Sequence, residues 1–156
     1  MEKREKMEIR EFFKEDKAAQ ARWIEEIKKS DWKAAGYLAE LLTKGAFKDT
    51  FGEGELYLLT DGDRLAAFVS FAQRDCLKNE SRSPWAGFVY TFPEHRGRRY
   101  SELLIGKCAE AAKKMGYDKL YICTDHVGLY EKYGFTFLEN GVDWWGGEER
   151  ILQKQI

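Results

Sequence analysis

The residue types best suited to chemistry gather in one basic stretch, residues 93–101, which reads Pro-Glu-His-Arg-Gly-Arg-Arg-Tyr-Ser. A turn here would aim backbone N–H groups and two or three guanidinium groups at one point, beside the positive end of a helix dipole. Guanidinium forks match phosphate oxygens, and Gly97 lets the main chain approach a ligand closely. The stretch predicts a local anion site, for a pyrophosphate in particular. From charge alone, a solvated Arg-rich helix start that binds nothing is an equal alternative.

Three predicted elements position this turn. Residues 85–92 form an apolar strand, and Pro93 ends it because proline cannot donate a ladder hydrogen bond. An amphipathic helix follows the turn and ends at Gly116, and residues 119–124 return as a second strand. Residues 88–124 therefore predict a βαβ unit with the basic turn where its helix begins. The apolar face of that helix is predicted to comprise Leu104, Cys108, Ala111 and Met115.

The rest of the chain supplies further strands and two amphipathic helices. Asp61-Gly62-Asp63 is a strong hairpin signal between two β-prone runs, which with residues 85–92 predict an antiparallel meander. Asp16 is expected to cap the first helix, Ser30 or Asp31 the second, and Gly45 to end the second. The predicted strands are residues 7–12, 55–60, 64–73, 136–139 and 150–156, and the predicted helices are residues 17–29, 32–44 and, shorter, 128–133.

Length and composition predict one globular domain over residues 1–156. There are 26 basic and 27 acidic residues, so the chain lacks the basic excess of a broad nucleic-acid interface, and no nucleic-acid partner is expected. No apolar run approaches the roughly 20 residues that span a bilayer, so no membrane partner is expected. The three cysteines cannot pair completely and lack metal-ligand spacing, which favours reduced thiols in the cytoplasm and no metal.

Two motifs, one at the basic stretch and one further along the chain, resemble those of the GCN5-related N-acetyltransferase (GNAT) superfamily. Residues 93–105 match its signature of a strand, Arg or Gln, two variable residues, Gly, one residue and Gly or Ala, opening a helix. Residues 129–135, Leu-Tyr-Glu-Lys-Tyr-Gly-Phe, look like the family's Tyr-Glu-Lys-x-Gly-Phe motif, one helix and one strand later. Two positions depart from the pattern: Arg99 stands where the family usually has its first glycine, and Ser101 replaces the second.

The resemblance implies a fold and a cosubstrate. The implied fold is α+β, with a central mixed, mostly antiparallel sheet of six to seven strands, helices on both faces and one splayed pair of parallel strands. Acetyl-CoA would lie where those two strands separate, its pantetheine arm on the backbone of residues 85–92 and its pyrophosphate on residues 97–102. The implied acetyl-CoA-binding residues are Val89, Tyr90, Thr91, Gly97, Arg98, Arg99, Tyr100, Ser101 and Glu102.

The implied activity is direct attack of a primary amine, of a small molecule or a peptide, on the acetyl thioester. Tyr130 matches the tyrosine that similar enzymes place beside the thioester sulfur, although a ring that only anchors the short helix is the structural alternative. Asp125, His126 or an ordered water could serve as the base, and none is chosen. The acceptor amine is not identified. Homodimers are common among similar proteins, but the oligomeric state is left open.

Aromatic residues outside these motifs suggest where an acceptor would sit. Trp23, Trp32 and Tyr37 lie on the first two helices, which usually roof the cleft in similar proteins. Trp144-Trp145-Gly146-Gly147 suggests a loop with exposed aromatic surface that lines an acceptor pocket, mediates dimerisation or packs on the sheet edge. Two other function classes stay open: a catalytically silent acyl-CoA-binding sensor and a plain interaction domain.

Overall fold

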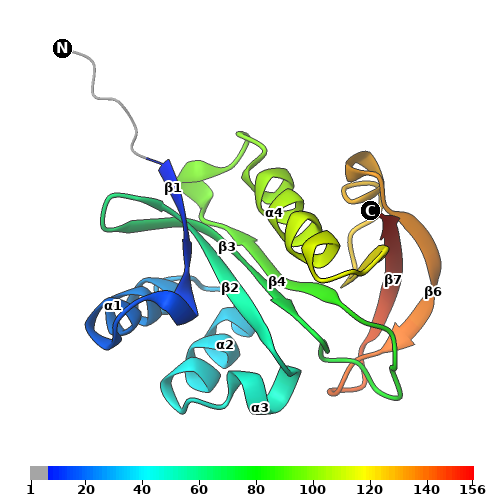
Figure 1. Cartoon of the computed structure of the whole chain (residues 1–156), viewed down its shortest axis with the longest axis horizontal. Helices are drawn as coiled ribbons and strands as arrows, with labels where there is room; N and C mark the ends of the chain where they lie inside the picture. The colour runs from blue at the N-terminus through cyan, green and yellow to red at the C-terminus, as the bar shows by residue number, and fades with distance from the viewer. Residues whose placement is uncertain (1–6) are drawn as a thin grey trace.

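The computed structural model describes residues 7–156, and their strands form one seven-stranded sheet in the order β1-β2-β3-β4-β5-β7-β6 (Figure 1). Neighbouring strands are antiparallel except β4 and β5, which are parallel. This confirms the predicted α+β class with a mixed, mostly antiparallel sheet. The strands are β1 (Met7–Glu11), β2 (Gly54–Asp61), β3 (Arg64–Ala72), β4 (Trp85–Thr91), β5 (Lys119–Thr124), β6 (Thr136–Val142) and β7 (Glu148–Gln155).

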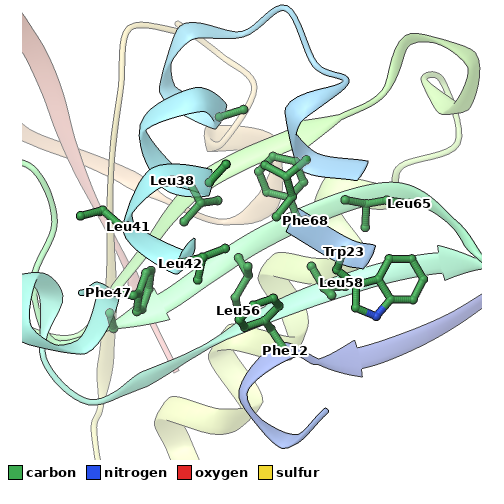
Figure 2. Packing of buried hydrophobic residues seen from close by; sticks show 14 of the residues in the cluster. Phe12, Trp23, Leu38, Leu41, Leu42, Phe47, Leu56, Leu58, Leu65 and Phe68 are labelled. Carbon is green, nitrogen blue, oxygen red and sulfur yellow. The ribbon is translucent and has the colours of Figure 1, made fainter. Parts of the chain in front are cut away.

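Helices cover both faces of the sheet (Figure 1). On one face lie α1 (Lys17–Lys28), α2 (Lys33–Thr43) and α3 (Phe47–Phe51); on the other lies α4 (Tyr100–Lys114). Alternation along β2 fills both layers, because successive side chains of a strand point to opposite faces. Leu56 and Leu58 join the α1–α3 cluster that Figure 2 shows, whereas Tyr57 and Leu59 join the cluster under α4. Short 3₁₀ turns lie at Phe12–Lys14, Pro93–His95 and Glu131–Tyr133.

Local signals place most helix ends where the sequence predicts them. Asp16 caps α1, and its Oδ1 accepts a hydrogen bond of 2.8 Å from the Ala19 N–H. Gly45, at φ 67°, follows the end of α2 as predicted. The predicted side-chain cap of α2 is wrong: Trp32 holds the N-cap position without a side-chain hydrogen bond. Helix α3, only five residues long, is not predicted at all.

The buried face of α4 is rotated from the predicted one. Leu104 and Cys108 are buried as expected, but Ile105 and Ala112 complete the face. Met115, predicted to be apolar core, is 58% exposed because it follows the last helical residue. Helix α4 therefore keeps the predicted βαβ crossover between β4 and β5 while turning a slightly different side toward the sheet. None of the helices in residues 7–156 is long and apolar enough to cross a membrane.

Candidate active site

A gap between the two parallel strands opens into a large cleft. Strands β4 and β5 pair only at Trp85–Tyr121 and Ala86–Ile122. From Gly87 on, no strand within residues 7–156 pairs with this edge of β4. The two strands diverge into a cleft of about 1260 Å³ whose walls come from β4, β5, the basic turn, α2 and the loops after β5 and β6. The expected splayed strand pair is thus present.

A bulge in β4 accompanies the divergence. Phe88 has φ 47°, and the register with β3 shifts between the pairs Ser70–Gly87 and Phe68–Tyr90. An extra residue at a bulge re-aims the strand and increases its twist. Beyond the bulge the Arg96 Nε donates a 3.0 Å hydrogen bond to the Thr91 carbonyl, which fixes the end of β4 against the basic turn. The stretch between bulge and turn therefore offers backbone groups to the cleft.

The basic turn presents the N-terminus of α4 to the same cleft. Gly97 has φ 84°, and Arg99, the N-cap residue, is left-handed at φ 60° and ψ 33°. No side chain caps this end of the helix. The first N–H groups of a helix have no intrahelical partner, so an uncapped end beside a cleft is suited to an anion. Arg99 adopts the backbone conformation that a glycine would supply, which explains how it occupies the glycine position of the motif.

Of the nine residues expected to bind the cosubstrate, the structure places seven in the wall of the cleft. Arg98 and Glu102 are outside that wall, and Glu102 instead accepts hydrogen bonds from the Arg99 guanidinium at 2.8 and 3.1 Å. The Ser101 Oγ lies 2.8 Å from the Tyr133 hydroxyl and links the first turn of α4 to the loop that carries Tyr130. The seven are Val89, Tyr90, Thr91, Gly97, Arg99, Tyr100 and Ser101.

A pair of variants tests the backbone at residue 99. A residue with a Cβ pays about 1–2 kcal/mol in the left-handed region, a penalty that glycine avoids. We expect Arg99→Gly to have a free energy of unfolding about 1 kcal/mol above that of Arg99→Ala. Both variants lose the same exposed ion pair to Glu102, so the difference isolates the backbone. Urea unfolding measures it, and equal stability of the two variants would contradict a strained Arg99.

Tyr130 lies in the wall of the cleft with a buried ring. Its side chain is 5% exposed and packs edge-on against Tyr133 and Phe135. Burial, and next the nearby Tyr133, raise the pKa of Tyr130 above its usual value, so the hydroxyl stays protonated at neutral pH. Within residues 7–156 this hydroxyl makes no hydrogen bond. Tyr130 therefore both anchors the loop and keeps a free donor at the cleft.

The aromatic residues separate into wall and core. Trp32 and Tyr37 of α2 and Trp145 of the β6–β7 loop line the cleft, and Tyr37 packs edge-on against Trp145. The prediction for Trp23 is wrong: it is 2% exposed in the core between α1 and the sheet. Trp144 stacks on Phe51 of α3, so it packs against the helical layer and not, as one of the predicted alternatives states, on the sheet edge.

Four carboxylates line the cleft, among them Asp75 beside Gly87, where the gap starts, whereas Arg96 is hydrogen-bonded to the Thr91 carbonyl at the other end of this stretch of β4. They are Asp75, Asp125, Asp143 and Glu149. Within residues 7–156 none of them forms an ion pair. Burial raises the pKa of Asp75 to about 6, and burial followed by the other three carboxylates raises the pKa of Glu149 to about 7. The cleft is thus cationic at one end and anionic at the other.

Of these four acids, only Asp125 lies where the sequence predicts a residue of the cleft. Asp75, Asp143 and Glu149 belong to separate loops and a strand end, and only the fold unites them. Asp125 and His126 are exposed at the cleft, after the end of β5. Cys108 is buried as expected, whereas Cys123 lies in the wall of the cleft and donates its thiol to Asp75 at 3.4 Å. No cluster of His, Cys, Asp and Glu in residues 7–156 is arranged to hold a metal ion.

Comparisons with known proteins agree with this geometry. Residues 10–135 match the model of the acetyltransferase (GNAT) family. A comparison with curated proteins gives no significant match. Aminoglycoside 6'-acetyltransferase type Ii has a similar structure, with TM-score 0.71 and 15% identity over 95% of this chain and 96% of that one.

Two further similar structures were solved with a coenzyme. A GNAT family N-acetyltransferase (YhbS) from Escherichia coli in complex with CoA has TM-score 0.70 and 17% identity, covering 99% of this chain and 84% of that one. A GNAT family acetyltransferase from Elizabethkingia anophelis with acetyl-CoA bound has TM-score 0.66 and 15% identity, covering 96% of this chain and 98% of that one. At these identities the likeness concerns the fold.

Proposed function

Since the chain belongs to the acetyltransferase (GNAT) family, we propose that it transfers an acetyl group from acetyl-CoA to a primary amine of a small molecule or a peptide. One observation carries the proposal. The unpaired edge of β4, the uncapped N-terminus of α4 and the Tyr130 side chain all border one cleft. An acyl carrier needs all three: the helix N-terminus for its diphosphate, the strand edge for its amide-containing arm, and the hydroxyl for its thioester.

The residues of the cleft fit each part of acetyl-CoA. The backbone of Val89, Tyr90 and Thr91 would pair with the amides of the pantetheine arm as an added strand does. The N–H groups that begin at Gly97 would hold the diphosphate, with the Arg99 guanidinium beside it. The motif also implies Arg98 and Glu102. We propose that these two residues lie next to the diphosphate site without binding the diphosphate. The similar structures solved with CoA and acetyl-CoA support a ligand of this kind.

Tyr130 would serve the leaving thiolate. With unperturbed values near 10 for tyrosine and 8.5 for a thiol, full proton transfer is uphill by about 2 kcal/mol. The raised pKa of Tyr130 makes the transfer harder still. The hydroxyl therefore acts first as a hydrogen-bond donor that stabilises charge on sulfur as the C–S bond breaks. Its lack of a partner within residues 7–156 leaves it available for this role.

The anionic end of the cleft would receive the acceptor. An amine is an ammonium at neutral pH, and unpaired carboxylates attract it, more strongly in a partly desolvated cleft than in water. Trp32, Tyr37 and Trp145 offer ring faces to its apolar part. This composition favours a cationic acceptor over an anionic one.

We further propose that the chain forms one domain and works in the cytoplasm, which is consistent with its three free thiols. We also propose that it has no nucleic-acid or membrane partner.

Two assays test the proposal in sequence. Thermal or urea unfolding with acetyl-CoA at 100 times its dissociation constant should show about 2.7 kcal/mol of added stability. Release of free CoA thiol should then follow addition of an amine from a panel of L-lysine, spermidine, an aminoglycoside and a peptide N-terminus. Stabilisation without thiol release from any amine would favour a silent acyl-CoA sensor, and no stabilisation would leave only an interaction domain.

A further inference from the structure

Glu149 occupies a particular place beside the gap. It is the second residue of β7 and pairs with Gly141 of β6. The next residue, Arg150, pairs with Thr124, the last residue of β5. Glu149 therefore lies one position beyond the last paired residue of β5, opposite the start of the loop that follows β5. Its side chain is half-buried and lines the cleft.

Strand alternation puts Glu149 and Tyr130 on opposite faces of the sheet. Glu149 shares a face with Ile151, two residues on, and Ile151 packs with Leu77 and Trp85. The neighbouring Leu152 faces the other way, into the cluster under α4 that contains Tyr130. The gap between β4 and β5 passes from one face to the other, and both side chains border it. A carbonyl carbon held in the gap would have Glu149 on the acceptor side and Tyr130 on the α4 side.

The other three carboxylates of the cleft are less available. Asp75 accepts hydrogen bonds from the Cys76 N–H at 2.7 Å and from the Cys123 thiol. Asp143 Oδ1 accepts from two backbone N–H groups of its own loop, both at 2.9 Å. Asp125 is exposed past the end of β5. Within residues 7–156 Glu149 receives no N–H donor and no cation; its half-buried carboxyl is in hydrogen-bond contact with the Asp143 side chain, which raises its pKa and so favours the uptake of a proton.

We infer that Glu149 is the general base of this reaction, an inference that rests on the proposed function. The bound ammonium first gives one proton to solvent, and the Glu149 carboxylate then takes a second proton from the neutral amine nitrogen as that nitrogen bonds to the thioester carbonyl carbon. The C–S bond breaks, and its electron pair stays on sulfur. The Tyr130 hydroxyl stabilises the thiolate by donating a hydrogen bond, the thiolate takes a proton from solvent, and Glu149 returns its own proton to solvent. The products are the amide and the free thiol, and no other reactant is needed.

The surroundings of Glu149 set its pH dependence. Burial raises its pKa to about 7, and the carboxylates of Asp125, Asp143 and Asp75 raise it in the same direction. The thiols of Cys76 and Cys123 also face it, and both stay protonated because burial raises their pKa. A base works when deprotonated, so kcat should rise with pH through about 7 and level off above it.

The test compares Glu149→Gln with Glu148→Gln, its exposed neighbour on β7 that is outside the cleft. With acetyl-CoA and the panel amines above, loss of a general base should lower kcat by roughly 10²–10⁴-fold and remove the rise through pH 7. Glu148→Gln should keep both, and all three proteins should bind acetyl-CoA within about twofold, a margin of 0.4 kcal/mol. The amine's own ionisation is common to all proteins, so the difference between profiles reports Glu149.

A second measurement does not depend on the acceptor or on a variant that folds. A ¹³C NMR titration of the wild-type glutamate carboxyls should show one group that titrates near pH 7. If every glutamate titrates like a free side chain, near pH 4, the inference is wrong. It is also wrong if Glu149→Gln keeps kcat within a few-fold and the same acid limb. Failure of the wild-type chain to bind acetyl-CoA, or to acetylate any panel amine, would instead overturn the proposed function.

Discussion

Replacing Tyr130 by Phe should lower kcat by roughly 10- to 150-fold while the affinity for acetyl-CoA stays nearly unchanged. A hydrogen bond to a charged group contributes about 1.5–3 kcal/mol, and the sulfur acquires its charge only in the transition state. The lost hydroxyl would therefore affect turnover and not ground-state binding. Steady-state release of CoA thiol, together with calorimetric titration of acetyl-CoA, measures both quantities.

The structure offers a control for this variant. The Tyr130 hydroxyl has no hydrogen-bond partner within residues 7–156, so its removal should not lower the free energy of unfolding. Tyr117, half-buried beyond α4 and outside the cleft, supplies the matched variant Tyr117→Phe, which should keep the wild-type rate. An unchanged kcat in Tyr130→Phe would reduce Tyr130 to a packing residue.

A negative charge at the second residue of α4 should abolish tight binding of acetyl-CoA. Ser101 lines the cleft in the first turn of this helix. Two like charges about 4 Å apart repel by about 4 kcal/mol at an effective dielectric constant of about 20. With some relief by salt and movement, Ser101→Glu should weaken acetyl-CoA binding by roughly 100-fold or more. Calorimetry in low salt gives the largest effect.

Ser101→Gln is the matched control, because it has the size of glutamate without the charge. Both variants lose the hydrogen bond to Tyr133, worth about 1 kcal/mol. A glutamate in the first turn of a helix recovers about 0.3–1 kcal/mol through the helix dipole. Ser101→Glu should therefore be at least as stable as Ser101→Gln yet bind acetyl-CoA far more weakly. Equal affinities in the two variants would argue against a diphosphate at this helix end.

Signals within a few residues explain the parts of the fold that the sequence predicts. The predicted turn at Asp61-Gly62-Asp63 joins β2 to β3, and Gly62 has the positive φ of 62° that such a turn requires. Asp16 satisfies an N–H group of its own helix, and the apolar strands on either side of α4 make a parallel crossover. Each signal acts inside one element or between adjacent elements. It can therefore be interpreted without knowing which distant parts of the chain come into contact.

Features that depend on other parts of the chain were predicted less well. Helix α3 is too short to show a period, and its place is set by packing of Phe47 and Phe51 in the core. The face of α4 shifted because helix phase near Met115 depends on where the helix ends. At the bulge, Phe88 has a positive φ. Glycine usually takes this conformation, so a phenylalanine in the sequence does not predict it.

The candidate site divides along the same line. The basic turn and Tyr130 lie in contiguous motifs, and the sequence alone predicts both. The anionic half does not form a motif: Asp75 follows β3, Asp143 follows β6, and Glu149 is the second residue of β7. Their proximity and the raised pKa of Glu149 exist only in the folded chain, because burial causes the shift. A base could therefore not be chosen before the fold was known.

The central claim is that the gap between β4 and β5, with the N-terminus of α4 at its end, binds acetyl-CoA. Calorimetric titration of the wild-type chain with acetyl-CoA at two temperatures tests it most directly, since buried apolar surface changes the binding heat with temperature. The claim predicts saturable heat at a ratio of one acetyl-CoA per chain. Absence of heat at both temperatures with millimolar acetyl-CoA would contradict it.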